Sequence, residues 1–376
     1  MQTRDIPQLN ITTSRLGFGA MRMPEKDRQI DYPRAEALID YCMQNGITYY
    51  DTAWVYHNKQ SEPFLRRALV ERYPRGRFTL ATKLPLGECH SPADMARIFE
   101  AQRQKLGVEY IDFYLLHGID ADGWDQFKRL GAPAYLRRLK DEGKIRFGGF
   151  SFHDDNAAFA PILDEFPCDF CQIQVNYADW YQRGADELYR AAAERNIPII
   201  IMEPVRGGGL ANLYPGMLEL LTRHDPEASQ TSWAMRFCGA LPHADVVLSG
   251  MSTLKQCEDN IKTFSALRPL SDAENETLRA IARAFDSIPH IPCTQCRYCD
   301  GCPRGIDIPW MFTAMNIHLR YQGRWELSFE YWNNISEAHR ASACIQCGQC
   351  EAICPQRIGI INELKRVHQK ALSLRE

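Results

Sequence analysis

Eight of the fourteen cysteines fall into two short runs near the end of the 376-residue chain. The first run, CTQCRYCDGCP, begins at Cys293, and the second, CIQCGQCEAICP, begins at Cys344. Three thiolates at two-residue spacing can surround one cubane iron-sulfur cluster, whereas zinc sites usually combine separated CxxC pairs. The two runs therefore predict two [4Fe-4S] clusters, and two structural zinc ions are the alternative.

In proteins with two such clusters, the fourth cysteine of each run binds the other cluster. The ligands predicted for the first cluster are Cys293, Cys296, Cys299 and Cys354. Those predicted for the second cluster are Cys344, Cys347, Cys350 and Cys302. The second run fits the bacterial spacing in full, but the first has two residues before its fourth cysteine where the signature has three. The module resembles the helical two-cluster ferredoxin domains of reductase iron-sulfur subunits.

A second set of polar residues follows short apolar runs in the earlier part of the chain. The set consists of Asp51, Lys83, His117, Ser151, Asn176, Glu203 and Ser249. The runs are rich in β-branched or aromatic residues and alternate with longer amphipathic segments, which is typical of βα units. Strands are expected at 16–20, 47–51, 78–83, 110–117, 145–151, 170–176, 199–203 and 246–250.

The segments between these strands predict helices that cross back over a sheet. They lie at 34–45, 91–106, 124–143, 185–196 and 254–266. Eight βα units within about 250 residues match the size of a closed (β/α)8 TIM barrel. The strand-end residues would then collect at the rim where such barrels carry their active sites. A doubly wound open sheet is the alternative α/β fold.

The pattern changes after Leu267. We expect residues 1–270 to form the barrel, 271–290 a linker helix, and 291–376 a smaller, all-helical iron-sulfur domain. Within that domain, helices are expected at 309–322, 325–340 and 362–374. No strand pattern is visible there.

Four motifs at the ends of successive predicted strands resemble the aldo-keto reductase family. They are LGFGAMRMP (16–24), DTAWVY (51–56), TK (82–83) and LLH (115–117). The resemblance spans roughly Arg15 to Leu267. It implies a barrel oxidoreductase that uses a nicotinamide cofactor to reduce a carbonyl.

The residues in these motifs suit that chemistry. A carbonyl that accepts hydride becomes an alkoxide, so the site needs an acid, and Tyr56 is the predicted donor. The ordinary tyrosine pKa of about 10 is high for this task, and the ammonium of Lys83, oriented by Asp51, would lower it. His117 would polarise and position the carbonyl oxygen. The alternative is a structural ion pair beside a buried histidine.

The same resemblance implies contacts to NADP(H). The residues in matching positions are Ser151 and Gln172 at the nicotinamide carboxamide, Met202 against its ring, and Gly250, Ser252, Gln256 and Asn260 at the phosphates. Many family members place an arginine where Gln256 stands, as a partner for the 2′-phosphate. NADP(H) is therefore expected, with NAD as the alternative.

We expect NADP(H)-dependent reduction of a small-molecule carbonyl compound: an aldehyde, a ketone or a sugar. A flavin-linked or partner-linked electron-transfer reductase is one alternative. A nicotinamide releases two electrons as hydride while a cluster passes one, so that alternative needs a flavin or an electron-transfer protein, although no GxGxxG fingerprint is present. The other alternative is a non-catalytic redox-sensing subunit, like the potassium-channel β subunits that resemble this family.

The composition of the chain argues against nucleic acid and membranes as binding partners. The chain carries 44 basic and 47 acidic side chains, a net charge of −3, and no basic block that would attract nucleic acid or an anionic membrane. The longest apolar run, near 197–202, is too short to span a bilayer, and no basic segment leads into an apolar stretch at the N-terminus. We therefore expect a cytoplasmic protein without nucleic-acid or membrane partners.

Overall fold

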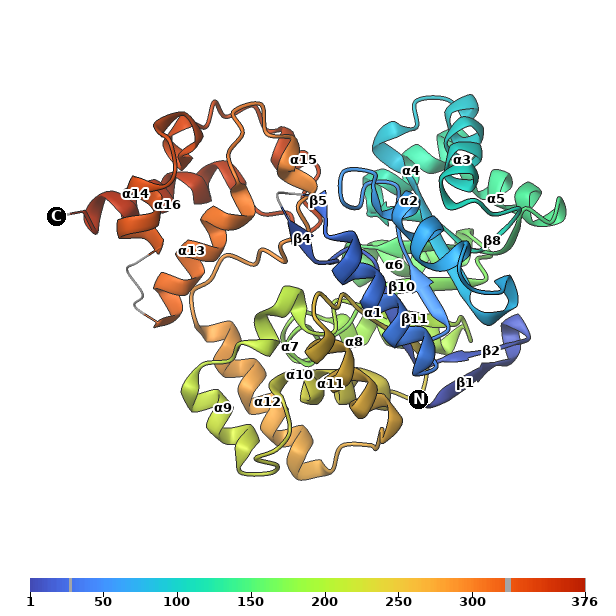
Figure 1. The fold of residues 1–376 in the computed structure, drawn as a ribbon, viewed down its shortest axis with the longest axis horizontal. Coiled ribbons are helices and arrows are strands. Elements are labelled where there is room, and N and C mark those ends of the chain that lie inside the picture. The colour runs from blue at the N-terminus through green and yellow to red at the C-terminus, as the bar shows by residue number, and fades with distance from the viewer. Residues whose placement is uncertain (27–28, 322–325, 376) are drawn as a thin grey trace. The chain divides into compact units, whose positions relative to one another are not determined.

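The computed structural model describes residues 1–26, 29–321 and 326–375 and divides into two compact units (Figure 1). The first unit comprises Met1–Val205 and Glu227–Arg279, and the second comprises Arg206–Pro226 and Ala280–Glu376. Helix α12 (Asp272–Ser287) crosses from the first unit into the second. The sequence pattern did not indicate that Arg206–Pro226 would group with the C-terminal part, and the predicted limits of the linker stay a prediction.

Eight parallel strands close the first unit into a barrel, so the predicted (β/α)8 fold is confirmed and the open sheet is wrong. The strands neighbour one another in the order β10-β11-β12-β3-β6-β7-β8-β9. Their bounds are β3 Leu16–Gly19, β6 Tyr49–Asp51, β7 Thr79–Pro85, β8 Ile111–Ile119, β9 Ile145–Phe152, β10 Phe170–Gln174, β11 Ile199–Met202 and β12 Ala244–Ser249. Every predicted strand has its counterpart among these eight.

The helices of this unit surround the barrel (Figure 1). They are α1 Tyr32–Gln44, α2 Ser61–Leu65, α3 Pro92–Leu106, α4 Ala121–Leu130, α5 Ala132–Asp141, α6 Asn156–Glu165, α7 Tyr177–Gln182, α8 Ala185–Glu194, α10 Gln230–Ala240 and α11 Leu254–Ser265. The single helix predicted over 124–143 is wrong, because Gly131 adopts φ 72° and separates α4 from α5. A left-handed glycine ends a helix without the steric penalty of a Cβ atom.

Aromatic and aliphatic side chains fill the barrel. Tyr49, Phe113 and Phe170 pack together with Ile6 and Leu9. Those last two residues belong to the hairpin of β1 (Thr3–Ile6) and β2 (Ile11–Ser14) and to the turn between these strands. Strands β7 and β8 are buried on both faces, and their sequences are therefore nearly continuous apolar runs.

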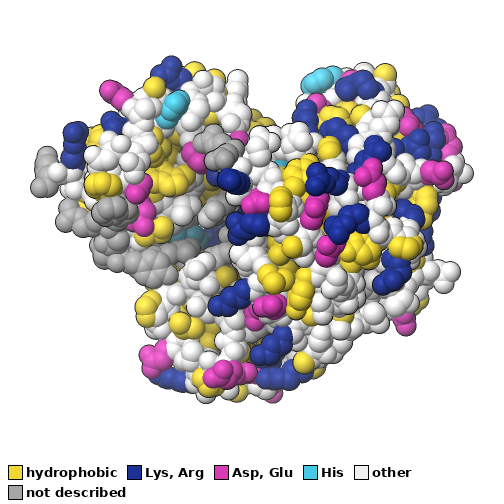
Figure 2. All heavy atoms as spheres, in the orientation of Figure 1, with side chains coloured by type: hydrophobic (Ala, Val, Ile, Leu, Met, Phe, Trp, Pro, Cys, Tyr) yellow, Lys and Arg dark blue, Asp and Glu magenta, His cyan; other side chains and the backbone are white. Residues whose placement is uncertain are grey.

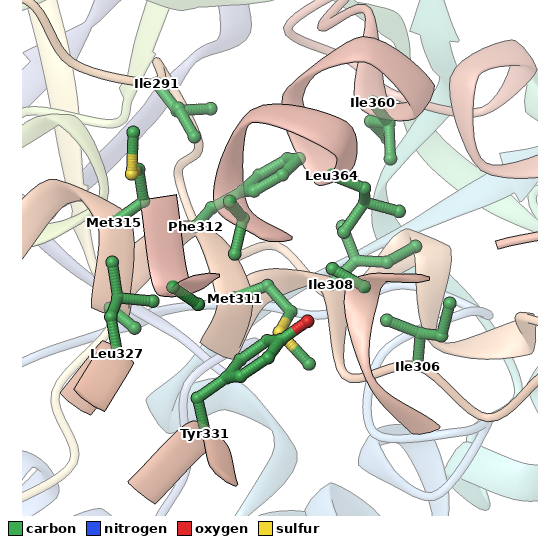
Figure 3. Close-up of a cluster of buried hydrophobic side chains, with 14 of the residues drawn as sticks. Ile291, Ile306, Ile308, Met311, Phe312, Met315, Leu327, Tyr331, Ile360 and Leu364 are labelled. Atoms are coloured by element: carbon green, nitrogen blue, oxygen red, sulfur yellow. The ribbon is translucent and has the colours of Figure 1, made fainter. Parts of the chain in front are cut away.

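The second unit is helical and has its own core (Figure 3). It contains α9 Pro215–Thr222, α13 Ile308–Tyr321, α14 Tyr331–Asn333, α15 Gln349–Ala352 and α16 Ile360–Ser373. Met311 and Phe312 of α13 pack with Leu364 of α16 in this core. Of the helix predicted over 325–340, residues 326–333 are helical, as a π-helical turn (Glu326–Glu330) followed by α14, but the helix ends there and does not continue to Arg340. Trp325, like Gln322 of the preceding predicted helix, lies outside the described residues.

Basic and acidic side chains are interspersed on the face of the molecule shown in Figure 2. This mixture agrees with the near-balanced net charge of −3. Across residues 1–26, 29–321 and 326–375, no helix has the length and apolar character that crossing a membrane requires.

Candidate functional site

Three adjacent strands bring Asp51, Lys83 and His117 to one rim of the barrel. Asp51 is the last residue of β6, Lys83 lies in β7, and His117 lies in β8. The strands pair in this order, with Lys83 opposite Leu115 and His117 opposite Pro85. Because parallel strands place their carboxyl ends at the same edge, the barrel fold itself assembles the three side chains.

Tyr56 comes from the loop that follows β6. Its carbonyl accepts a hydrogen bond of 3.3 Å from the N–H of Ser61, the first residue of α2. Three of the four residues between them, His57, Asn58 and Lys59, have φ of 48°, 52° and 68°. Non-glycine residues adopt this left-handed conformation at a cost of about 1 to 3 kcal/mol each, and such strain tends to occur at functional sites.

The Lys83 side chain is fully buried, and three oxygen atoms surround its nitrogen. Nζ lies 2.6 Å from Oδ1 of Asp51, 2.8 Å from the carbonyl oxygen of Thr52 and 3.3 Å from Oη of Tyr56. An ammonium group has three N–H donors, so these three acceptors match it. Since Lys83 donates to the Tyr56 oxygen, the phenol hydrogen is left to point elsewhere.

The electrostatics of this pair follow from burial. Burial lowers the pKa of Lys83, while the charge and hydrogen bond of Asp51 raise it. Burial also raises the pKa of Asp51, and Lys83 opposes that change. An opposite charge at hydrogen-bonding distance favours the ionised form of each group. Asp51 is therefore the main support for the positive charge on Lys83.

His117 differs from the ion pair of Asp51 and Lys83 in its charge. Burial, followed by the charges of Lys83 and His153, lowers the pKa of His117 well below its ordinary 6.5. The imidazole is therefore neutral near pH 7 and can donate a hydrogen bond without carrying a charge. Its ring centroid lies 6.0 Å from that of Tyr56, at 79° between the ring planes.

His153 is a further residue of this rim that the sequence reasoning missed. It follows β9, two positions after Ser151, and its N–H donates to the carbonyl of Ile119 at 2.9 Å. Burial and then the charge of Lys83 lower the pKa of His153 to about 4. Its place directly after a predicted strand was the available signal.

A buried carboxylate behind Lys83 was also missed. Glu62 accepts hydrogen bonds from Oγ1 of Thr82 at 2.8 Å and from Nε2 of Gln102 at 2.7 Å. Its charge adds to the raising of the Lys83 pKa, after the larger contribution from Asp51. Lys105 approaches Glu62 to 3.7 Å. No spacing rule connects these residues, because α2, α3 and β7 converge only in the fold.

Ser151, Gln172 and Met202 lie on the neighbouring strands β9, β10 and β11. The Ser151 hydroxyl accepts a hydrogen bond of 2.8 Å from the N–H of Gly118, so its own hydrogen can be donated. Gln172 donates from Nε2 to Sδ of Met202 at 3.5 Å, and its buried Oε1 has no hydrogen-bond partner among the described residues. A buried acceptor in this state suits a ligand amide that donates to it.

The segment after β12 carries the residues predicted at the phosphates. Gln256 folds back so that its Oε1 accepts from the N–H groups of Ser252, at 2.7 Å, and Thr253, at 3.1 Å. This forms a capping box at the start of α11. The side chain thus occupies donors that a phosphate would otherwise use.

Two other residues of that segment contact a loop near β3. Ser252 donates from its hydroxyl to the carbonyl of Arg22 at 2.5 Å, and a Cβ on Gly250 would lie 2.9 Å from the Arg22 side chain. Asn260 donates to Oγ of Ser249 at 2.9 Å, while its buried Oδ1 has no hydrogen-bond partner in the described part of the chain. The structure therefore gathers Gly250, Ser252, Gln256 and Asn260 in one region.

The cysteines of the second unit line two cavities. The first cavity, of about 20 Å³, is lined by Cys293, Cys296, Cys299 and Cys354. The second, of about 150 Å³, is lined by Cys302, Cys344, Cys347 and Cys350, and also by Cys299, which lines both cavities. The fold thus brings the fourth cysteine of each run to the other run. Among described residues, no three His, Cys, Asp or Glu side chains converge closely enough for a single metal ion.

The glycine-rich segment after β11 packs against the first cysteine run. A Cβ on Gly207, whose φ is 64°, would lie 2.5 Å from Cα of Thr294. The Arg206 guanidinium lies 3.1 Å from Nε2 of His290 and stacks over the ring of Phe285 at 5.3 Å. These contacts explain why Arg206–Pro226 groups with the second unit.

A barrel with polar side chains gathered at one rim is the framework of many oxidoreductases, and comparison with known proteins identifies which kind this one is. The model of the Aldo/keto reductase family matches residues 15–283, and that of the 4Fe-4S dicluster domain matches residues 292–359. The chain belongs to the aldo/keto reductase family and is an oxidoreductase joined to a 4Fe-4S dicluster domain.

Individual relatives agree with this assignment. L-galactose dehydrogenase of Arabidopsis thaliana is 23% identical over 310 residues, which cover 77% of this chain and 96% of the relative. An aldo-keto reductase from Bacillus halodurans, in its holo form, is 25% identical with a TM-score of 0.59 over 76% of this chain and 97% of its own. An aldo-keto reductase of Klebsiella pneumoniae in complex with NADPH shares the fold, with 19% identity and a TM-score of 0.58 over 76% and 96% of the two chains.

Proposed function

We propose that the barrel reduces a small carbonyl compound, an aldehyde, ketone or sugar, with NADP(H), and that Tyr56 is the general acid. The observation that carries this proposal is the buried Lys83 ammonium, 3.3 Å from the Tyr56 oxygen and 2.6 Å from Asp51. A fixed positive charge at this distance stabilises the phenolate that remains when the proton leaves.

The nicotinamide end of the site suits the cofactor. The Ser151 hydroxyl and the Gln172 Oε1 offer one donor and one acceptor, which complement a carboxamide. Met202, whose Sδ accepts from Nε2 of Gln172 at 3.5 Å, would contact the ring. When bound, the nicotinamide supplies hydride. The neighbour from Klebsiella pneumoniae, whose structure contains NADPH, supports this choice of cofactor.

The chain's own residues supply the proton and hold the carbonyl. Tyr56 gives its phenol proton to the oxygen that gains negative charge, while Lys83 keeps its hydrogen bond to the phenol oxygen. The neutral His117 donates a hydrogen bond to that carbonyl oxygen and orients it. Asp51 keeps Lys83 charged and fixed throughout.

The cysteine cavities support two [4Fe-4S] clusters with crossed ligands. Cys293, Cys296, Cys299 and Cys354 would hold the first, and Cys344, Cys347, Cys350 and Cys302 the second. Such clusters supply one-electron transfer. Thiols kept reduced for this purpose fit a cytoplasmic location.

One observation favours an electron-transfer reductase as a second candidate function: Cys347, at the second cavity, is exposed. A cluster held there would be open to a partner protein. A flavin or similar group, which converts between hydride and single electrons, would then belong to that partner.

The test of the main proposal is Tyr56→Phe, measured as carbonyl-dependent NADPH oxidation by the anaerobically purified full chain. We expect a loss of about 10² or more in kcat, because general acid catalysis contributes about that much. Tyr135→Phe, on α5 and distant in sequence from the motif, is the control and should keep its activity. Full activity of Tyr56→Phe would overturn the assignment of the acid.

A further inference from the structure

The two cysteine cavities differ in how they meet the surface. Apolar side chains line the first, including Phe312, Ile358 and Ile360, each buried, and none of its four cysteines is exposed. The second cavity is larger, about 150 Å³ against about 20 Å³, and one of its cysteines, Cys347, is exposed. A cluster held at the second site would therefore be the more accessible of the two to an external electron carrier.

Two large apolar side chains at the second cavity are exposed to solvent. Ile345 is 59% exposed and Ile353 is 49% exposed, and both line the second cavity. They stand within the second cysteine run, on either side of Cys347 and Cys350. Exposed apolar groups gathered at one place and rimmed by polar residues mark protein interaction sites.

One charged side chain stands among the residues that line the second cavity, and it is basic. Arg304 is exposed and lines the cavity, and Lys365 is exposed with its Nζ 3.3 Å from Oε1 of Gln346. A positive rim attracts an acidic partner and repels a basic one.

We propose that Ile345, Ile353 and Arg304 form a docking face for a small acidic protein that carries one electron at a time. In the exchange, the carrier loses one electron and the cluster held by Cys302, Cys344, Cys347 and Cys350 gains it; no bond forms or breaks and no proton moves. This inference rests on the proposed second cluster and names its partner.

The test uses the anaerobically purified full chain and, as the probe, a purified acidic [2Fe-2S] ferredoxin. Its dissociation constant is measured by calorimetry at low salt, and the rate of cluster reduction by the reduced ferredoxin is measured by stopped flow. Arg304→Glu and the pair Ile345→Ser with Ile353→Ser should each weaken binding and slow reduction at least fivefold. Reduction by dithionite should be unchanged.

Matched controls lie in the same unit and away from the face. Arg223→Glu changes an exposed arginine at the end of α9, and Leu372→Ser changes a 45% exposed leucine of α16. Equal effects of the face and control variants would overturn the docking face, as would a preference for basic cytochrome c over ferredoxin. An iron content of about four per chain in the unaltered protein would instead overturn the two-cluster assignment.

Discussion

At the scale of single residues, the charge on Lys83 is the property on which the proposed chemistry depends. Its nitrogen is fully buried, and burial alone lowers its pKa. Asp51 provides the largest opposing effect, and Glu62 provides a smaller one. The two carboxylates therefore set the upper pH at which Lys83 still supports Tyr56.

This dependence predicts the pH profile of Asp51→Asn. Removing an adjacent negative charge lowers the pKa of Lys83 further, so the alkaline fall in kcat/KM moves to lower pH, by about one unit or more. Glu62→Gln should move it in the same direction by less. The measurement is kcat/KM for a fixed aldehyde between pH 6 and 10, roughly the span between the histidine and lysine pKa values. An alkaline limb that stays in place in Asp51→Asn would contradict the role of Asp51.

Much of this site could be predicted from residue order, and the reason is physical. The strand ends Asp51, Lys83 and His117 meet at one rim because β6, β7 and β8 are parallel neighbours. Glu62 was missed because its contacts to Thr82 and Gln102 join separate elements. The Gln256 side chain accepts hydrogen bonds from the N–H groups of Ser252 and Thr253, and a sequence motif does not reveal this side-chain conformation.

At the scale of elements, the start of α11 bears on the choice between NADP(H) and NAD(H). Gln256 completes the capping box with the N-cap Thr253 and brings no positive charge to the helix. Gln256→Arg should therefore raise the preference for NADPH over NADH, measured as the ratio of their kcat/KM values, about tenfold or more, because an arginine pairs with a phosphate through charge-assisted hydrogen bonds.

The control for this prediction is Gln256→Ala. It removes the side-chain half of the capping box, the Oε1 acceptor of the Ser252 and Thr253 N–H groups, without adding a cation, and Thr253 remains the N-cap. Its cofactor preference should stay close to that of the unaltered chain. If alanine and arginine changed the preference equally, the effect would come from the lost side-chain hydrogen bonds of Gln256, and the phosphate would bind elsewhere.

The glycine-rich segment gives a second prediction at this scale. Gly207→Ala places a Cβ 2.5 Å from Cα of Thr294 in a backbone with φ 64°, so both collision and strain destabilise it. Gly208→Ala adds strain at φ 90° with open space around it, about 1 to 2 kcal/mol. Gly207→Ala should therefore lower the melting temperature of the full chain more than Gly208→Ala. Equal melting temperatures would show that the packing against Thr294 is dispensable.

The elements were easier to predict where the pattern is long and regular. The eight strands were found because buried β-branched runs are distinctive. The split of α4 from α5 at Gly131 depends on one backbone conformation, and the grouping of Arg206–Pro226 with the second unit depends on contacts distant in the sequence. Neither leaves a periodic signal.

At the scale of the whole molecule, the crossed ligand sets can be separated by double substitution. Removing Cys293 and Cys354 together should abolish only the first cluster and leave about half of the iron, because both line the first cavity and are its proposed ligands. Removing Cys344 and Cys354 together should abolish both clusters. Iron and acid-labile sulfide analysis is the measurement, and the reverse pattern would show that each run binds its own cluster.

We infer that hydride from the cofactor goes to a carbonyl in the barrel and not to the clusters. The most direct measurement follows the absorption of NADPH and of the clusters together under anaerobic conditions, first with NADPH alone and then with an aldehyde added. Our account predicts unchanged cluster bands with NADPH alone, followed by NADPH oxidation once the aldehyde is present. Bleaching of the cluster bands by NADPH alone would contradict it.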